Sequence, residues 1–563
     1  MRGVRVSLEQ RPRRALGQYY TPVEIAAFAV RTLARHGALD AASVRVIDPA
    51  AGPGLFLEAV TDVLASAEVI GLDVDPRVEG GHVRVGNGLV DVPEVGVTEG
   101  AFEVAVGNPP YGGLGLIELS RLARGEGQDS DWRVAEAVAR LRALAASLGP
   151  VPRALHARQL TPAVRRWLDR AFRHPIEMLF LERFVRLLRP GGWMAVVVPE
   201  GVLANARAAD LRAFLSQHGR VAAIIGLPRV FAKAGAAART ALLVYQREPS
   251  MAGDVAVSDV DLEWTPRGQV SRRRVDLTSY LAAPPTVTVS WSVLRDQRWD
   301  PQFWDPRWAS PLTGMADLPT RPLGDFIEHL TYGPIVTRIR PRDLPGDVPI
   351  LSQGQIEESG IVLHASPRVA AGSVFDPPRC RVRRGDLLFP RSGAGSLGRN
   401  RLAVFDGEAP VALGCFVDLI RLRGVCAWFV WIFLKTRFGW GQVKRLINGV
   451  GMPNISFDEI RSIRIPCVDE AFQREVEARW RRDVLPAHLR LLRSLEAEAQ
   501  VAAARAEAEA HMRTLVEWVE HALSGGAGAP LETAAAACTR TASREGPVQT
   551  QGSIHGEANK SER

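Results

Sequence analysis

Short apolar runs alternate with amphipathic stretches from residue 44 to about residue 247. The apolar runs are rich in β-branched residues and end at Gly, Asp or Asn, as buried strands commonly do. The amphipathic stretches between them predict helices, one of which, PIEMLFLERFVRLL (175–188), stops at Pro-Gly-Gly. This alternation predicts a doubly wound α/β sheet. We expect strands at 44–48, 68–74, 83–87, 102–108 and 193–201, and a final strand pair at 221–228 and 241–248.

The pattern changes after residue 250. A stretch containing Pro and Trp suggests a linker or domain edge at 251–322. Short strands and Gly-Asp turns without a β-α-β rhythm then predict a separate α+β domain at 323–467, and the run VCAWFVWIFL (425–434) predicts a buried helix. Residues 468–523 are rich in Ala, Glu and Arg and predict long helices, whereas the tail at 524–563 has few large apolar residues and is expected to be disordered.

A basic insert interrupts the α/β pattern at about 114–176. It is mostly helical in pattern, and its part from 121 to 173 contains 11 arginines against 5 acidic residues. Such a surface suits a phosphate backbone, but it equally suits a solvated helical elaboration. The sequence does not decide between these two interpretations.

Composition limits the partners of the chain. The net charge of +8 favours a polyanion, although nearly all of the cations are arginines, a bias typical of a GC-rich bacterial genome. No apolar run reaches the roughly 18 residues that span a bilayer, and the first 16 residues, taken as an N-terminal arm, lack the apolar part of an export signal. The five cysteines form no C-x-x-C pair, so we expect reduced thiols, no metal site and a cytoplasmic location.

A glycine-containing turn follows the first predicted strand. VIDPAAGPG (46–54) places Asp48 at the strand end, and Gly52 and Gly54 allow the backbone to approach a ligand where the next helix begins. Asp73 ends the second strand, where a carboxylate can accept both ribose hydroxyls, and Asn87 ends the third. Leucine occupies position 57, where a dinucleotide fingerprint needs its third glycine. A nucleoside without a pyrophosphate, such as S-adenosylmethionine (AdoMet), therefore fits better; the alternative is a purely structural turn.

The fourth strand ends in VGNPPYGG (106–113). The exocyclic amine of adenine is a poor nucleophile, and two acceptors on its N–H bonds would push its nitrogen toward tetrahedral geometry. The side-chain oxygen of Asn108 and the backbone carbonyl of Pro109 can be these acceptors, because Pro109 and Pro110 fix the local backbone and remove competing donors. Tyr111 can stack on the base. The motif thus predicts catalysis by orientation and hydrogen bonding, without a strong general base.

Together, GQYYTP (17–22), DPAAGPG (48–54), GLDVDP (71–76) and VGNPPY (106–111) resemble the gamma-class N6-adenine DNA methyltransferases of restriction–modification systems. The segments at 187–203 and 226–246 match as well, so the resemblance covers roughly residues 15–250. It implies a seven-stranded AdoMet-dependent methyltransferase domain at 17–250. Only 16 residues precede the first motif, so we expect no nuclease domain there, and cleavage would belong to a partner restriction or translocase subunit.

The resemblance also assigns roles to individual residues. Thr21 would contact the methionine part of AdoMet, Asp48 its amino-acid end, and Asp73 its ribose. Phe231 would pack against a flipped adenine opposite Tyr111. Ala51 replaces a common cysteine, and Asn87 replaces the acidic residue that usually accepts from the cofactor's adenine amine. The cofactor set is completed by Gln18, Tyr20, Pro49, Ala50, Gly52 and Gly54.

The C-terminal half resembles the target-recognition domains of type I specificity subunits at 323–338, 383–405 and 446–466. Tyr332 and the arginines of RSGAGSLGR, Arg391 and Arg399, are candidates to contact DNA phosphates or guanine edges, with ordinary basic loops as the alternative. By the same resemblance, the helices of 468–523 would form a homodimer or dock a partner subunit. An intramolecular helical hairpin is the competing interpretation.

These features predict a site-specific, adenine-specific DNA methyltransferase that flips its target base out of the duplex. Four alternatives remain open at this point. An enzyme with the same NPPY motif can methylate N4 of cytosine, RNA, or a protein glutamine. A DNA-binding assembly subunit can also retain the pocket without using it for catalysis.

Overall fold

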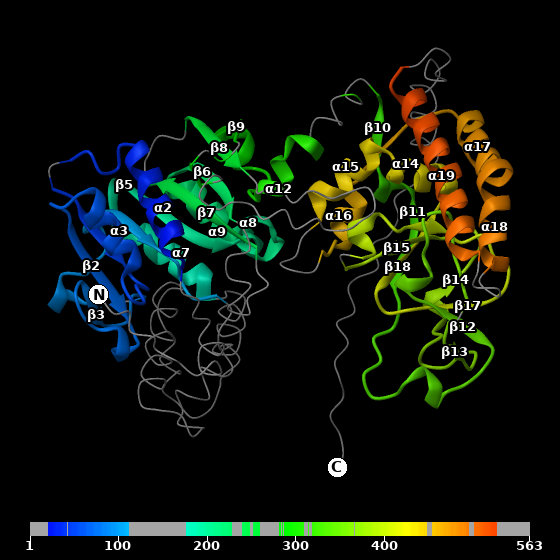
Figure 1. Cartoon of the computed structure of the whole chain (residues 1–563), viewed down its shortest axis with the longest axis horizontal. Coiled ribbons are helices and arrows are strands. Elements are labelled where there is room, and N and C mark those ends of the chain that lie inside the picture. The colour runs from blue at the N-terminus through cyan, green and yellow to red at the C-terminus, as the bar shows by residue number, and fades with distance from the viewer. Residues whose placement is uncertain are drawn as a thin grey trace, which may run out of the picture. The chain divides into compact units, whose positions relative to one another are not determined.

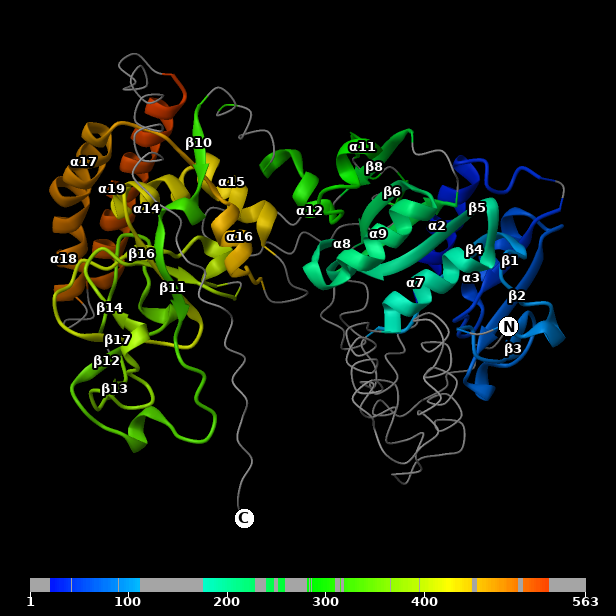
Figure 2. The same ribbon diagram turned by 180° about the vertical axis from the view of Figure 1, so that it is seen from behind.

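The computed structural model describes residues 21–525 except 42, 90, 112–175, 228–238, 248–251, 259–280, 283, 285, 309–313, 315–317, 365, 394, 448–452 and 495–499 (Figures 1 and 2). The N-terminal arm, all of the basic insert but its last residue, and nearly all of the predicted tail lie outside these described residues, as do Gln18, Tyr20 and Phe231. The chain divides into two compact units. The first comprises Met1–Ala309 with Lys444–Asn454, and the second comprises Ser310–Val443 with Ile455–Arg563.

The first unit contains a nine-stranded sheet in the order β3-β2-β1-β4-β5-β7-β6-β8-β9. Strands β1, β2, β3, β4 and β5 run parallel, and β7 lies antiparallel between β5 and β6. The α/β prediction is confirmed. The strands are β1 (Arg45–Asp48), β2 (Glu68–Asp73), β3 (Val83–Val85), β4 (Phe102–Gly107), β5 (Leu188–Pro199), β6 (Arg220–Leu227), β7 (Thr240–Gln246), β8 (Asp254–Ser258) and β9 (Val287–Ser290).

The expected count of seven strands is wrong, because β8 and β9 extend the sheet beyond β6. Both lie within 251–322, so the described strands and helices of that range are part of the first unit, whereas the sequence suggested a linker. The two strands have only 5 and 4 residues. Such short runs carry a weak periodic signal, and the strands are held by pairing, β8 with β6 and β9 with β8.

Helices cover both faces of this sheet, and strand β5 shows why the strands are continuously apolar. Met194, Val196 and Val198 pack into one core with α7 and α9, while Ala195 and Val197 pack into the other with α2 and α3. Successive side chains of a strand point to opposite faces, so a doubly covered strand must be apolar at every position. The helices are α2 (Val23–Arg35), α3 (Leu55–Val63), α7 (Ile176–Leu187), α8 (Glu200–Ala204), α9 (Ala209–His218), α11 (Trp291–Leu294) and α12 (Pro301–Trp304).

The second unit contains two four-stranded sheets and one strand pair. The first sheet has the order β11 (Ile327–Tyr332), β18 (Val417–Leu422), β15 (Leu387–Pro390) and β16 (Ala403–Val404). The second has the order β13 (Arg368–Val369), β12 (Val348–Leu351), β17 (Val411–Leu413) and β14 (Arg381–Val382). The pair is β10 (Thr320–Pro322) with β19 (Arg464–Pro466).

The helices of the C-terminal half are α14 (Ala427–Lys435), α15 (Arg437–Leu446), α16 (Phe457–Ser462), α17 (Glu470–Arg479), α18 (Leu485–Ser494) and α19 (Val501–Leu523), with a π-helical turn at Trp480–Val484 between α17 and α18. The predicted buried helix is confirmed, since Ala427–Leu434 of α14 is buried throughout. The long helices expected within 468–523 are also present. Residues Lys444–Leu446 at the end of α15 belong to the first unit.

The last helix packs within its own chain. Its buried residues Ala508, Met512, Leu515 and Val519 recur every three or four positions, which forms one apolar stripe. Helix α19 contacts α14 and α18, and Trp518 stacks on Phe472 of α17. The apolar stripe is thus occupied intramolecularly, as in the hairpin alternative, and a homodimer through these helices stays a prediction.

The structure also bears on the cysteines and on membranes. Cys380, Cys415 and Cys426 are free thiols, as the sequence predicts for them. Within the described part of the chain, no helix combines the length and the apolar character that crossing a bilayer requires.

Candidate active site

Three polar side chains of the first unit meet at the carboxyl edge of the sheet. Asp48 ends β1, Asp73 ends β2, and Asn108 follows the last residue of β4. Strand β1 pairs in parallel with β2 on one side and with β4 on the other. The ends of these strands therefore open on one edge, where ligands of doubly wound sheets bind.

The turn after β1 is tied to β2. Gly52 and Gly54 have φ of 51° and 87°, a left-handed backbone that favours glycine, and α3 begins directly afterwards. The backbone N–H of Gly52 donates to Asp73 Oδ2 at 2.8 Å, and the N–H of Ala51 donates to the carbonyl oxygen of Leu72 at 2.9 Å. The turn is thus held in a fixed position over the end of the second strand.

Asp73 is a preorganised acceptor. Besides the Gly52 contact, its Oδ1 accepts from the N–H of Asp75 at 2.9 Å. Burial raises the pKa of Asp73, and the backbone hydrogen bonds work against that shift. An ionised carboxylate has about four acceptor positions, so Asp73 retains acceptor capacity for a hydroxyl donor beside these backbone contacts.

The turn after β3 packs directly on the turn after β1. A Cβ added at Gly88 would lie 1.8 Å from the carbonyl oxygen of Pro49, so only glycine allows this approach. The neighbouring Asn87 accepts the N–H of Leu89 on its Oδ1 at 3.1 Å, and its Nδ2 is buried without a partner among the described residues. The unsatisfied group is therefore a donor, whereas the sequence suggested that Asn87 acts as an acceptor.

Asp48 is the most deeply buried polar group of the site, with 1% of its surface exposed. Its Oδ1 accepts the N–H of Ala50 at 3.0 Å, and no described residue donates to its Oδ2. Burial raises the pKa of Asp48 to about 8, with a smaller contribution from the charge of Asp73. Near neutral pH this carboxyl is consequently mostly protonated, and a cation placed beside it would favour its ionisation.

Asn108 is held from two sides. Its Nδ2 donates to Thr21 Oγ1 at 2.9 Å, and its Oδ1 lies within hydrogen-bond distance of the Tyr111 hydroxyl. That hydroxyl also lies 3.0 Å from the carbonyl oxygen of Val197 in β5. These contacts fix which end of the amide is the acceptor. Thr21 was predicted to contact the cofactor, and its contact with Asn108 was missed.

The side chain of Tyr111 is turned inward in this conformation. Only 8% of it is exposed, and burial, together with the charge of Glu177, raises the pKa of its hydroxyl. Pro109 is buried and Pro110 half-buried. The sequence suggested that the Tyr111 ring stacks on a base; the structure shows its hydroxyl beside the amide oxygen of Asn108, and the stacking role stays a prediction.

The candidate DNA-contacting residues lie in the second unit. Tyr332 ends β11 and Arg391 follows β15, and the guanidinium carbon of Arg391 lies 4.5 Å from the centroid of the Tyr332 ring. Arg399 ends a separate 3₁₀ turn, Leu397–Arg399, and is exposed. The structure therefore brings Tyr332 and Arg391 together.

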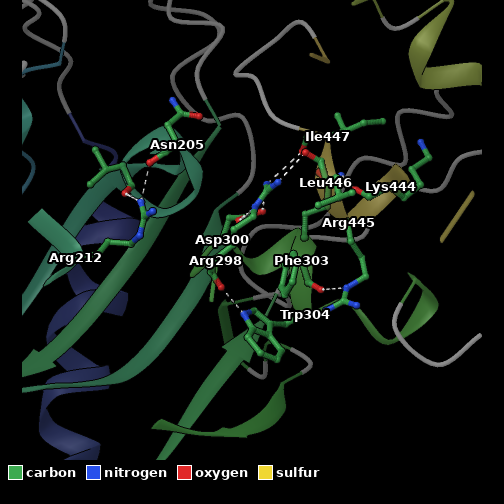
Figure 3. A network of polar contacts seen from close by, with 12 residues as sticks. Asn205, Arg212, Arg298, Asp300, Phe303, Trp304, Lys444, Arg445, Leu446 and Ile447 are labelled. Carbon is green, nitrogen blue, oxygen red and sulfur yellow. Dashed lines mark hydrogen bonds and ion pairs between the residues drawn. The ribbon is translucent and has the colours of Figure 1, made fainter. Parts of the chain in front are cut away.

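A polar network in the first unit joins residues that are far apart in sequence (Figure 3). Arg298 pairs with Asp300 and donates to the carbonyl oxygens of Leu446 at 2.7 Å and Ile447 at 3.4 Å. Arg445 donates to the carbonyl oxygen of Phe303 at 2.8 Å. The sequence analysis missed this network, because no periodic pattern encodes contacts between segments almost 150 residues apart.

Comparison with known proteins bears on part of the first unit. Residues 163–278 match the family model of the N-6 DNA methylases. The match supports an adenine DNA methyltransferase family. It spans helix α7 and strands β5 to β8, and the residues Asp48, Asp73 and Asn108 lie outside it.

The solved structures that are similar to the chain include the following three. The type IIG restriction endonuclease BpuSI is 14% identical, with a TM-score of 0.39, and the match covers 90% of this chain and 67% of that one. The M protein of the type I restriction enzyme EcoKI is 17% identical, with a TM-score of 0.30 and coverage of 52% and 66%. A putative class I AdoMet-dependent methyltransferase from Listeria monocytogenes is 19% identical, with a TM-score of 0.27 and coverage of 40% and 60%. The chain thus spans less than two thirds of the last two proteins.

Proposed function

We propose that this protein transfers a methyl group from AdoMet to N6 of an adenine flipped out of duplex DNA, as the modification component of a restriction–modification or phage-defence system. The arrangement of Asn108 carries the proposal. Its amide stands at the end of β4, beside the strand ends that carry Asp48 and Asp73, and is oriented by Thr21 and Tyr111. The N-6 DNA methylase match of residues 163–278 supports it.

The polar groups at the strand ends fit AdoMet. The remaining acceptor capacity of Asp73 suits the ribose hydroxyls, and Asn87 Nδ2, which has no partner among the described residues, suits an acceptor nitrogen of the adenine ring. Asp48 Oδ2, to which no described residue donates, suits the ammonium group at the amino-acid end of AdoMet. The left-handed turn at Gly52 and Gly54 leaves room beside the backbone, and Thr21, Pro49 and Ala50 complete the described part of this set.

The substrate amine would be held by Asn108 and Pro109. Asn108 Oδ1 and the carbonyl oxygen of Pro109 accept its two N–H bonds and make the nitrogen more nucleophilic, while AdoMet supplies the methyl group. The Tyr111 hydroxyl keeps the oxygen of Asn108 in position before the base enters. Because neither acceptor is a strong base, the rate enhancement comes from orientation and preorganised dipoles. Tyr111 and Phe231 are proposed to contact the flipped base.

The partners follow from the same proposal. Double-stranded DNA is the substrate, and the second unit, with Tyr332, Arg391 and Arg399, reads its sequence. A restriction or translocase subunit would supply cleavage. Helices α17 to α19 are proposed as the surface for that subunit or for a second copy of the chain, with the face of α19 opposite its buried stripe available for contact.

The direct test is incubation of the full chain with AdoMet labelled on the methyl group and duplex DNA of mixed sequence, followed by nucleoside analysis. We expect label only in N6-methyladenine. Label in N4-methylcytosine or in the protein, or the absence of labelled nucleoside, would contradict the proposal. RNA and a glutamine-containing protein extract serve as competing substrates in the same assay.

AdoMet binding is expected to strengthen as the pH rises. The pKa of Asp48 is about 8 in the ligand-free protein, and a cationic ligand favours the carboxylate, so binding below pH 8 requires loss of a proton. The dissociation constant should therefore increase by up to about tenfold for each pH unit below 8 and level off above it.

Calorimetric titration of the full chain with AdoMet between pH 6 and 9 measures this dependence. The Asp48→Asn variant is the control, because it retains the volume of the side chain and leaves only the titration of the ligand itself. We expect weaker binding and a flatter pH profile for this variant. Identical profiles for the two proteins would refute the assignment.

A further inference from the structure

The side chain of Arg391 lies against two neighbouring aromatic rings in the second unit. Its guanidinium carbon is 4.5 Å from the ring centroid of Tyr332 and 5.3 Å from that of Phe457, and the two centroids are 6.1 Å apart. Cation–π contacts with two rings restrict a side chain that otherwise has many rotamers. The guanidinium is thus held in one place without using its hydrogen-bond donors.

A buried carboxylate lies against the same guanidinium. Asp418 is fully buried, and its Oδ1 is 3.5 Å from Arg391 Nη1. In the sheet it is directly opposite Tyr332 of β11 and Phe389 of β15, so these three side chains share one face. Neither oxygen of Asp418 accepts a hydrogen bond from a described residue, and burial raises its pKa to about 7.

The burial of Asp418 is unfavourable for the free energy of folding. Burying a carboxylate beside one half-exposed partner costs more than an apolar side chain at the same position would. The charge of Asp418 restricts the orientation of the Arg391 guanidinium. About a third of the Arg391 side chain remains exposed, and no described residue accepts a hydrogen bond from its guanidinium. The donors are therefore oriented but unused.

The loops around Arg391 are tied to one another. Its backbone N–H donates to the carbonyl oxygen of Phe416 at 2.9 Å, and Gln353 Nε2 donates to the carbonyl oxygens of Ser392 and Phe416, both at 2.8 Å. The Phe416 side chain is 55% exposed. Arg379 adds a further cation and donates to Thr331 Oγ1 at 2.7 Å. A rigid, basic surface with an exposed aromatic ring surrounds the site.

We propose that Arg391 is a specificity-determining residue that donates to the O6 and N7 atoms of a guanine in the major groove, and that Asp418 is its positioning residue. The inference rests on the proposed function in taking duplex DNA as the partner. A guanine edge fits better than a phosphate for two reasons. The nearby carboxylate offsets part of the charge that would attract a phosphate, and a fixed planar fork of donors matches the paired acceptors of guanine.

Selection of bound sequences from a random duplex library tests this, because it measures binding by the full chain without requiring methyl transfer. The selected site is then remade with each base pair changed in turn. For Arg391→Gln we expect a loss of about 5- to 150-fold in affinity for the selected site. The loss should disappear when one particular G·C pair is replaced. Arg391→Lys, which keeps the charge but not the fork, should show the same loss of preference.

Two further variants separate positioning from structure. Asp418→Asn should weaken discrimination at that same G·C pair without lowering the thermal unfolding temperature. Arg384→Gln is the matched control, since Arg384 is a half-exposed arginine of this unit that pairs with Asp406 at 3.0 Å and lies over no ring of a described residue. It should leave the selected sequence unchanged and the affinity within about twofold.

Several outcomes would overturn the inference. Equal weakening on every sequence by Arg391→Gln, with a shallower salt dependence, would identify a phosphate contact. An unchanged base preference in both Arg391 variants, or a wild-type protein without sequence preference, would also refute it. A wild-type protein that selects a G-containing site but forms no N6-methyladenine would disprove the proposed function and leave this inference to be judged by the binding data.

Discussion

Asn108→Ala is expected to lower the rate of methyl transfer by roughly 10²–10³-fold or more while leaving DNA affinity within a few fold. The variant removes an acceptor that Thr21 and Tyr111 hold in place before the base arrives. Asn108 lies in the first unit, and the residues proposed to read DNA lie in the second, so binding and chemistry should separate. Single-turnover transfer of labelled methyl to a selected site gives the rate, and a gel or anisotropy titration gives the affinity.

Tyr111→Phe is the matched control for that experiment. It retains the aromatic ring and removes only the hydroxyl beside Asn108 Oδ1. If the hydroxyl orients the amide, the rate falls, but less than in Asn108→Ala, because the acceptor itself is still present. A rate in Asn108→Ala that equals the wild-type rate would exclude the amide as the acceptor. Parallel loss of methyl transfer and DNA binding would instead indicate a folding defect.

The edge of the sheet was predictable because local signals and topology agree there. Asp48, Asp73 and Asn108 each come at the end of a predicted strand. The parallel pairing of β1 with β2 and β4 brings these strand ends to one edge of the sheet. The orientation of the amide was not predictable. It depends on Thr21 and Val197, which lie 87 and 86 residues from their partners, and no periodic pattern encodes such contacts.

The errors have equally specific causes. Strands β8 and β9 were missed because four or five residues do not establish a period and because their stability comes from pairing, β8 with β6 and β9 with β8. Asp418 was missed although a signal exists, since it is an acidic residue inside the apolar run CFVDLI (415–420). A charged side chain in the middle of a buried strand is rarely found without an oppositely charged partner, and here Asp418 pairs with Arg391.

Arg298→Ala is expected to reduce the free energy of unfolding of the first unit by about 3–5 kcal/mol. Arg298 and Asp300 form a two-point ion pair at 2.8 and 2.9 Å, with 13% and 3% of their side chains exposed. The variant removes the hydrogen-bonded partner of the buried Asp300 carboxylate and the donors of the Leu446 and Ile447 carbonyl oxygens. The loss of unfolding free energy therefore exceeds that for a surface ion pair. The variant also weakens the contact between 298–300 and 446–447 within the first unit.

Hydrogen exchange of peptides from β5 to β7 reports on this unit separately from the second, which a single denaturation midpoint does not do. Arg295→Ala is the control, because Arg295 pairs with Asp296 at 3.5 Å where both side chains are well exposed, and it should cost at most about 0.5 kcal/mol. Arg298→Ala combined with Asp300→Ala should recover part of the loss, since no buried charge is then left unpaired. Equal hydrogen-exchange rates in the Arg298 and Arg295 variants would show that the Arg298–Asp300 ion pair does not stabilise the first unit.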